Sequence, residues 1–285
     1  MESLLTFLAD GLLLGFVYGV AAIGMTLIWG VMKVINLSHN VLIAYSMFGV
    51  YLLFNNLGIN PYLAIILVAG LGLLLGILIY LIAVHRVIDA PELCTLLATF
   101  SVSMIMTGVG TAVWTTSPRN IEFSLGSFSL GPVTLPVTRA VAALAAALAT
   151  AGLYLFLYRT RPGRYIRAVA NNREAAEMVG VPSNQILALS FGLGAMLASI
   201  AGGLIATFFP FNILGGMNYQ LKSFVIGVLG GLGNPIGALV GGLILGTLEG
   251  VIPIFMETSW VPVFEFGLFV LTIIFRPSGL LGAKQ

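Results

Sequence analysis

Long apolar runs separated by short polar segments dominate the chain. A helix needs about 20 predominantly apolar residues to cross a bilayer, and eight runs approach or exceed that length. They are Gly11–Met32, Val41–Leu57, Tyr62–Val84, Leu93–Thr115, Val137–Tyr158, Ile186–Phe209, Ile236–Ile252 and a run within Ser259–Phe275. This pattern predicts eight transmembrane helices.

One further apolar run, Ser223–Gly233, is too short to cross as a regular helix. Eleven helical residues would cover roughly 16 Å, about half of the hydrocarbon core. The run leads directly into Gly233-Asn234-Pro235, a helix-breaking sequence. We expect a short or broken crossing, which is tolerated only where protein buries it or it lines a wet cavity.

Glycines recur every four residues in the first and seventh spans. The first series is Gly11, Gly15 and Gly19, and later series include Gly242, Gly246 and Gly250. Small residues at this spacing allow two helices to approach closely. The close approach could lie inside the bundle or between subunits.

Composition agrees with a membrane protein. The 285 residues are 59% hydrophobic and 8% charged, whereas soluble domains carry about 25% charged residues. A surface with so few charges belongs in lipid. We expect one all-α, polytopic membrane domain over residues 1–285.

The distribution of lysine and arginine predicts the orientation, because cytoplasmic loops carry an excess of both. A basic segment, residues 159–185, anchors the cytoplasmic side, and nine of the twelve basic residues then lie inside. These are Arg159, Arg161, Arg164, Arg167, Arg173, Lys33, Arg86, Arg276 and Lys284, while Arg119, Arg139 and Lys222 lie outside. The N-terminus is therefore expected outside and the C-terminus in the cytoplasm.

Enzyme signatures are missing from the sequence. There is no GxxxxGK[ST] phosphate loop, HExxH, CxxC or GxSxG motif, and the chain has two histidines and one cysteine. We therefore expect no ATP site, catalytic residue, metal site or cofactor. Few aromatic residues accompany the basic segment, and membrane orientation explains its charge without nucleic acid.

Ionisable residues at membrane depth are functional candidates, and few occur here. Glu249 lies near the outer end of its span, where an interfacial position is expected. Glu265 could face a wet path, or its span could begin later. No chain of buried carboxylates suited to proton or sodium coupling is evident, which disfavours an ion-driven carrier.

Two segments are candidates for the translocation path. The first is polar for its surroundings and could face a solute or form a cytoplasmic loop; it contains Asn36, Ser38, His39 and Asn40. The second is the broken crossing, a candidate gate or pathway wall; it contains Gly230, Gly231, Gly233 and Asn234.

The basic segment contains its own helix signals. Asn171 followed by Glu174 fits a capping box, and the next residues favour helix. Gly180 can end this helix, and Pro182 follows. A helix of about two turns is unstable alone in water, so it must pack on its own bundle or in a partner's groove.

The spacing of Glu174-Ala175-Ala176 and Gly180 resembles the EAA loop of ABC importer permeases. Further segments are similar to LivH-type permeases of branched-chain amino acid importers; they are GMTLIWGVMKVINLSHN (24–40), GRYIRAVANNREAAEMVGV (163–181), LKSFVIGVLGGLGNPIGALVGG (221–242) and FRPSGLLG (275–282). The chain departs from the EAA pattern after Gly180, because the isoleucine-x-leucine-proline that often follows is absent.

This resemblance implies a subunit of an ATP-driven importer for branched-chain or related neutral amino acids, in a bacterial or archaeal cytoplasmic membrane. Implied partners are a second, related permease, two ATPases and an external binding protein. The residues expected to couple to the ATPases are Asn171, Arg173, Glu174, Ala175, Ala176, Glu177 and Gly180. Alternatives are import of urea, short amides or other amino acids, and a stand-alone channel or ion-coupled carrier.

Overall fold

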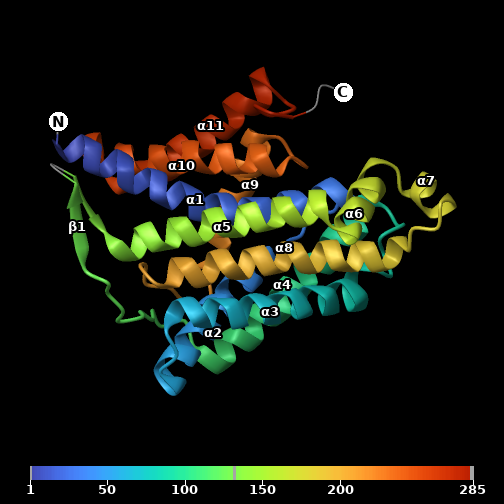
Figure 1. Cartoon of the computed structure of the whole chain (residues 1–285), viewed down its shortest axis with the longest axis horizontal. Coiled ribbons are helices and arrows are strands. Elements are labelled where there is room, and N and C mark those ends of the chain that lie inside the picture. Colours follow the sequence, from blue (N-terminus) through green and yellow to red (C-terminus); the bar gives the residue numbers. More distant parts are fainter. Residues whose placement is uncertain (1, 131–132, 283–285) are drawn as a thin grey trace.

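The computed structural model describes residues 2–130 and 133–282, which form a bundle of helices running along its long axis (Figure 1). Lys284, which the sequence analysis expected on the cytoplasmic side, lies outside the described residues. The helices in chain order are α1 (Glu2–Met32), α2 (His39–Leu57), α3 (Pro61–Ile79), the π-helical turn η1 (Tyr80–Val84), α4 (Glu92–Trp114), α5 (Val137–Arg159), α6 (Arg161–Asn171), α7 (Arg173–Met178), α8 (Ser183–Ala206), α9 (Gly216–Gly230), α10 (Pro235–Phe255), the 3-10 turn η2 (Thr258–Trp260) and α11 (Val261–Phe275).

Eight helical segments among the described residues are long and apolar enough to cross a membrane. Helix α3 and η1 together make one of them, Pro61–Val84. Both the all-α class and the number of spans predicted from the sequence are confirmed.

Helix starts follow from capping residues. Asn60 accepts a hydrogen bond from the backbone N–H of Tyr62 at 3.0 Å, and Pro61 is the first residue of α3. Asn234 caps α10 in the same way, accepting from Ile236 and Gly237. Proline at the first helical position costs nothing, because its missing N–H would be unpaired there. The sequence Gly233-Asn234-Pro235 therefore starts a helix as well as interrupting one.

The short crossing is a regular helix, but its bounds differ from those expected. Helix α9 has 15 residues and begins at Gly216 instead of Ser223. Its first residues include polar Gln220, which packs inside the bundle and is only 4% exposed. Lys222 is consequently the seventh residue of α9 instead of a residue flanking the short span.

Close contact between α1 and α10 explains the glycine series. A Cβ on Gly15 would lie 2.7 Å from the Cα of Leu243, and one on Gly11 would lie 3.1 Å from the Cα of Gly250. Only glycines allow the two backbones to approach this closely. The close approach considered from the sequence is therefore made inside the bundle at these positions.

The two ends of the bundle differ. Figure 1 places the N-terminus and strand β1 (Ser127–Leu130) at one end of the long axis and helices α6 and α7 at the other. Strand β1 pairs antiparallel with β2 (Val133–Pro136). A second link at this end is a bridge in which the N–H of Arg119 donates to the carbonyl of Phe211 at 2.8 Å.

Candidate functional site

The polar connection between α1 and α2 folds back into the bundle. Nε2 of His39 lies 3.0 Å from the carbonyl oxygen of Ala21, which is eleven residues before the end of α1 at Met32. At 1.5 Å per residue this is roughly 16 Å along the helix. The segment is therefore buried at depth, and the alternative of a loop at the surface is wrong.

Most side chains of this connection bond to protein. Asn36, Ser38 and His39 are fully buried, and both the N–H and the hydroxyl of Ser38 donate to Oδ1 of Asn36, at 3.0 and 2.6 Å. These contacts hold the start of α2 in place. None of these three residues lines the large cavity described below.

Asn40 connects three helices. Its Oδ1 accepts from the hydroxyl of Ser103 on α4 at 2.9 Å, and its N–H donates to Oε1 of Gln220 on α9 at 3.1 Å. It is the partly exposed member of the predicted polar group. Like the other three, it lies outside the lining of the large cavity.

The turn between α9 and α10 is held by the C-terminal segment. Leu280 and Leu281 donate backbone hydrogen bonds to the carbonyls of Leu229 and Gly230, at 2.8 and 3.1 Å. Gly231 has φ +104°, and a Cβ there would lie 2.7 Å from the backbone nitrogen of Gly282. The C-terminal segment therefore packs closely on Gly230 and Gly231, the residues predicted to form a gate.

Gly233 and Asn234 have a different environment. They line a small cavity of about 190 Å³ between α1, α5, α6 and α10. Asn234 also donates through Nδ2 to the carbonyl of Leu281 at 2.8 Å. The two predicted path segments therefore occupy separate places in the bundle.

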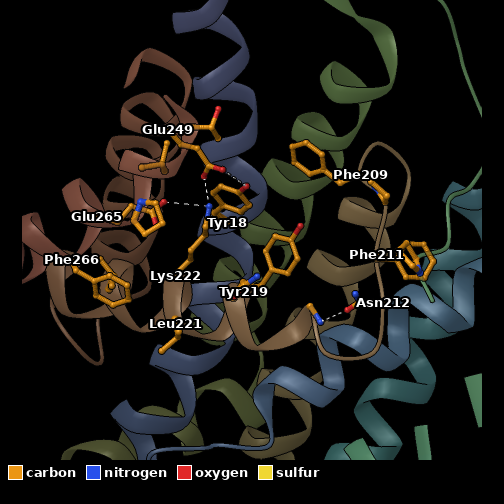
Figure 2. Close-up of a pocket in the computed structure, with 18 residues that line it drawn as sticks. Tyr18, Phe209, Phe211, Asn212, Tyr219, Leu221, Lys222, Glu249, Glu265 and Phe266 are labelled. Carbon is orange, nitrogen blue, oxygen red and sulfur yellow. Dashed lines mark hydrogen bonds and ion pairs between the residues drawn. The ribbon is translucent and has the colours of Figure 1, made fainter. Parts of the chain in front are cut away.

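A larger cavity of about 630 Å³ lies between α1, α9, α10, α11 and the connection after α8 (Figure 2). Its walls are mainly aromatic and other apolar side chains. The lining residues are Tyr18, Pro118, Phe209, Pro210, Phe211, Asn212, Gly215, Asn218, Tyr219, Leu221, Lys222, Val225, Glu249, Thr258, Val261, Pro262, Glu265 and Phe266.

Three charged side chains meet on the wall of this cavity. Nζ of Lys222 lies 2.5 Å from Oε2 of Glu249 and 3.3 Å from Oε1 of Glu265. The hydroxyl of Tyr18 donates to the other oxygen of Glu249 at 3.3 Å, and the ammonium of Lys222 lies 4.9 Å from the centre of the Tyr18 ring. Figure 2 shows these side chains converging from four helices.

The sequence analysis did not predict this charged group, in which two carboxylates of different helices lie beside one lysine. Glu265 is only 4% exposed, and Lys222 and Glu249 are largely buried. The sequence left two interpretations of Glu265, a position facing a water-filled path or a later start of its span. Its position in the cavity wall supports the first. The available signal was that each of the last three helices carries an ionisable residue within its apolar sequence.

A second site is α7, at the other end of the bundle. Asn172 caps this helix by accepting from the N–H of Ala175 at 2.9 Å. The predicted cap, Asn171, is wrong because Asn171 is the last residue of α6, which the sequence analysis did not anticipate. Glu174 is consequently the second residue of α7, so the capping box does not form.

The predicted end of α7 is confirmed. Gly180 has φ +84°, a conformation that favours glycine. Its N–H donates to the carbonyl of Glu177, and that of Val181 donates to Ala176, both at 3.0 Å. The chain then turns directly into α8.

Two ion pairs hold Arg173 at the start of α7. Its Nη1 lies 2.8 Å from Oδ1 of Asp89 in the connection before α4, and its Nε lies 3.0 Å from Oε1 of Glu177. Burial lowers the pKa of Arg173, but the hydrogen bonds and charges of these two carboxylates outweigh it and raise the pKa above its ordinary value. The guanidinium therefore stays charged and can hold both contacts.

The outer face of α7 is open. Ala176 is its one buried residue, while Glu174, Ala175 and Glu177 are exposed. Two apolar side chains at its end, Met178 and Val179, are 82% and 80% exposed. Among the described residues, no group of three metal-ligating side chains occurs here or elsewhere.

Comparisons with known proteins agree over nearly the whole chain. Residues 7–273 match the family described as the permease component of the branched-chain amino acid transport system. The permease BraD of Pseudomonas aeruginosa is 30% identical over 98% of this chain and 95% of its own length. The permease LivH of Salmonella typhimurium is 28% identical over 97% and 94%.

More distant similarities extend to other transport systems. The ribose import permease RbsC of Escherichia coli is 29% identical over 67% of this chain and 61% of its own length. The solved structure of PsaBC from Streptococcus pneumoniae in complex with Fab has a TM-score of 0.53 at 14% identity, covering 95% of this chain and 92% of the other. That likeness concerns the fold alone.

Eight candidate spans, the missing phosphate loop and a match over residues 7–273 describe a membrane component that is not itself an ATPase. The chain belongs to the LivH/BraD family of permease components of branched-chain amino acid ABC transporters.

Proposed function

We propose that this permease carries branched-chain or related neutral amino acids into the cell, using ATP hydrolysed by partner subunits. The observation that carries the proposal is similarity over nearly the full length to LivH and BraD, whose names specify high-affinity branched-chain amino acid transport. The proposed complex contains a second, related permease, two ATPases and an external binding protein.

Helix α7 is the proposed contact with an ATPase. It is capped, ends at a glycine, buries only Ala176 and presents Met178 and Val179 to solvent. Exposed apolar side chains on a short, tethered helix suit insertion into a partner's groove. The proposed contact includes Asn171, Arg173, Glu174, Ala175, Ala176, Glu177 and Gly180, and we add Asn172 because it caps α7.

This role implies an orientation. With α7 in the cytoplasm, the end of the bundle with the N-terminus and the β1–β2 hairpin lies outside (Figure 1). The C-terminus lies inside, because α11 is the last of nine consecutive passes in the part of the chain that the structure describes, counting α9. The excess of lysine and arginine near α7 supports the same orientation.

Charge reversal on α7 tests the ATPase contact. In a pull-down from membranes expressing all subunits, wild type should retain the ATPases, and Glu174→Lys should lose them. Glu122→Lys is the matched control, since Glu122 is also exposed but lies in the connection that contains β1. Full retention of the ATPases by Glu174→Lys would contradict the proposed contact.

Uptake identifies the substrate. Proteoliposomes containing the four-subunit complex and its binding protein should accumulate leucine, isoleucine or valine when ATP is supplied on the ATPase side. Preferential uptake of urea, a short amide or ribose would contradict the proposed substrate but would still support ATP-driven import. Uptake that persists without the ATPases would instead favour a stand-alone channel or carrier.

A further inference from the structure

We propose that the cavity bounded by Lys222, Glu249 and Glu265 binds the primary ammonium group of the transported solute. This inference rests on the proposed function, in which the solute is an amino acid. The charged group is the part of the cavity that recognises the ammonium, and the aromatic wall covers the apolar side chain.

The balance of charge favours a cation. Lys222 contributes one positive charge, whereas Glu249 and Glu265 contribute two negative charges when ionised, and no other charged residue lines the cavity. With both carboxylates ionised, one negative charge is left unmatched within the group. An unmatched charge among membrane helices is costly, and a bound cation reduces that cost.

Hydrogen bonding points the same way. Oε1 of Glu265 is buried and accepts no well-formed hydrogen bond from the described residues, although Nζ of Lys222 lies 3.3 Å away. Lys222 lies closer to Glu249, which Tyr18 also contacts. Glu265 thus has acceptor capacity to spare, and an ammonium group supplies three donors.

The walls fit an amino acid with an apolar side chain. A volume of about 630 Å³ lies within the range of small-molecule sites. Aromatic rings of Tyr219 and Phe266 flank the charged group in Figure 2. Aromatic faces also attract ammonium groups, as the Tyr18 ring already attracts the ammonium of Lys222.

The cavity lies at the end where solute would enter. Helix α8 leads away from α7, so the lining residues Phe209 and Phe211, which follow α8, lie at the opposite end of the bundle. Thr258, after α10, lies at that end too, because Gly250 near the end of α10 packs on Gly11 near the start of α1. In the proposed orientation this is the external end.

The test reports on occupancy of the cavity directly. Asn218, an exposed lining residue, is replaced by cysteine in a Cys94→Ser background, because Cys94 is the chain's single cysteine. Modification of Asn218→Cys by a maleimide is quantified by mass spectrometry in the full complex in nanodiscs. The probes are L-leucine, 3-methylbutylamine, which lacks the carboxylate, and 4-methylpentanoate, which lacks the ammonium.

Leucine and the amine should slow modification, and 4-methylpentanoate should not. Adding Glu265→Gln, which keeps the shape but removes the charge, should weaken protection at least about tenfold, as expected for a lost charge-assisted hydrogen bond. Asp10→Asn is the matched control, because it removes a carboxylate from another partly buried ion pair, with Arg139, that does not line the cavity.

Three results would overturn the ammonium site. One is equal protection by 4-methylpentanoate, another is unchanged protection after Glu265→Gln, and the third is no protection at concentrations that saturate uptake. A wrong substrate proposal is a separate outcome, because the complex would then fail to take up leucine in the uptake assay. Protection by 3-methylbutylamine in a complex that does not carry leucine would support the ammonium site and reject leucine as the solute.

Discussion

Lys222 on α9 and Glu249 on α10 form an ion pair in which Nζ and Oε2 lie 2.5 Å apart, with both side chains largely buried. The contact joins the short helix α9 to α10, which is long enough to span a membrane. It also places the single cation of the large cavity between two carboxylates, since Glu265 lies on its other side.

Replacing Lys222 by methionine should destabilise the permease. The change keeps most of the side-chain volume but leaves Glu249 and Glu265 facing each other without a cation. Breaking a fully buried pair costs about 3–5 kcal/mol, and about 2 kcal/mol is expected here because both groups retain some exposure. Thermal unfolding in detergent measures the loss.

A double variant separates lost pairing from lost packing. Lys222→Met combined with Glu249→Gln removes one of the two unpaired carboxylates and with it their mutual repulsion, so it should recover part of the lost stability. Coupled residues depart from additivity in this way. Strictly additive losses would show that the pair contributes no interaction of its own.

Close packing of α1 on α10 makes a second prediction. A side chain at Gly246 would overlap the backbone of Gly15, so Gly246→Val should separate the helices and cost more than the roughly 1–3 kcal/mol typical of overpacking. Gly267→Val on α11 is the control, because nothing lies within 4 Å of its added Cβ. Yield of folded protein and thermal unfolding should separate the two variants clearly.

The tether at α7 predicts an effect on coupling more than on stability. Asp89→Asn weakens the contact with Arg173, an exposed ion pair that contributes about 1 kcal/mol or less. Unfolding should change little, while solute carried per ATP hydrolysed should fall because α7 is less firmly held. Since salt screens exposed charges, the difference from wild type should shrink at high ionic strength; a difference independent of salt would contradict the electrostatic tether.

The fold was largely predictable because bilayers constrain sequences strongly. Apolar length alone identified the spans, so the expected Tyr62–Val84 and the observed Pro61–Val84 differ by one residue. The same argument found that the crossing after α8 is short. It could not find that the crossing begins at Gly216, because the sequence does not reveal that polar Gln220 is buried and accepts a hydrogen bond from the N–H of Asn40 on α2.

The charged site was less predictable than the spans. Lys222, Glu249 and Glu265 are separated by 27 and 16 residues, and nothing in the sequence reveals that three helices bring them together. The polar connection before α2 was easier to notice because its residues are consecutive. Its burial, however, depends on a contact between His39 and Ala21 that the sequence does not predict.

Adjacent asparagines allow a direct test of the observed start of α7. Asn172 is extended, with φ −157° and ψ 109°, and its side chain accepts from Ala175, whereas Asn171 is exposed at the end of α6. Asn172→Ala should therefore remove a helix cap, which costs about 0.5–2 kcal/mol, and Asn171→Ala should have little effect. Because α7 has only six residues and buries only Ala176, the loss should appear as local opening. Hydrogen exchange at residues 173–178 should accelerate in Asn172→Ala alone, and capture of the ATPases should weaken with it. Faster exchange in Asn171→Ala, with unchanged exchange in Asn172→Ala, would contradict the observed cap and favour the capping box at Asn171 that the sequence predicted.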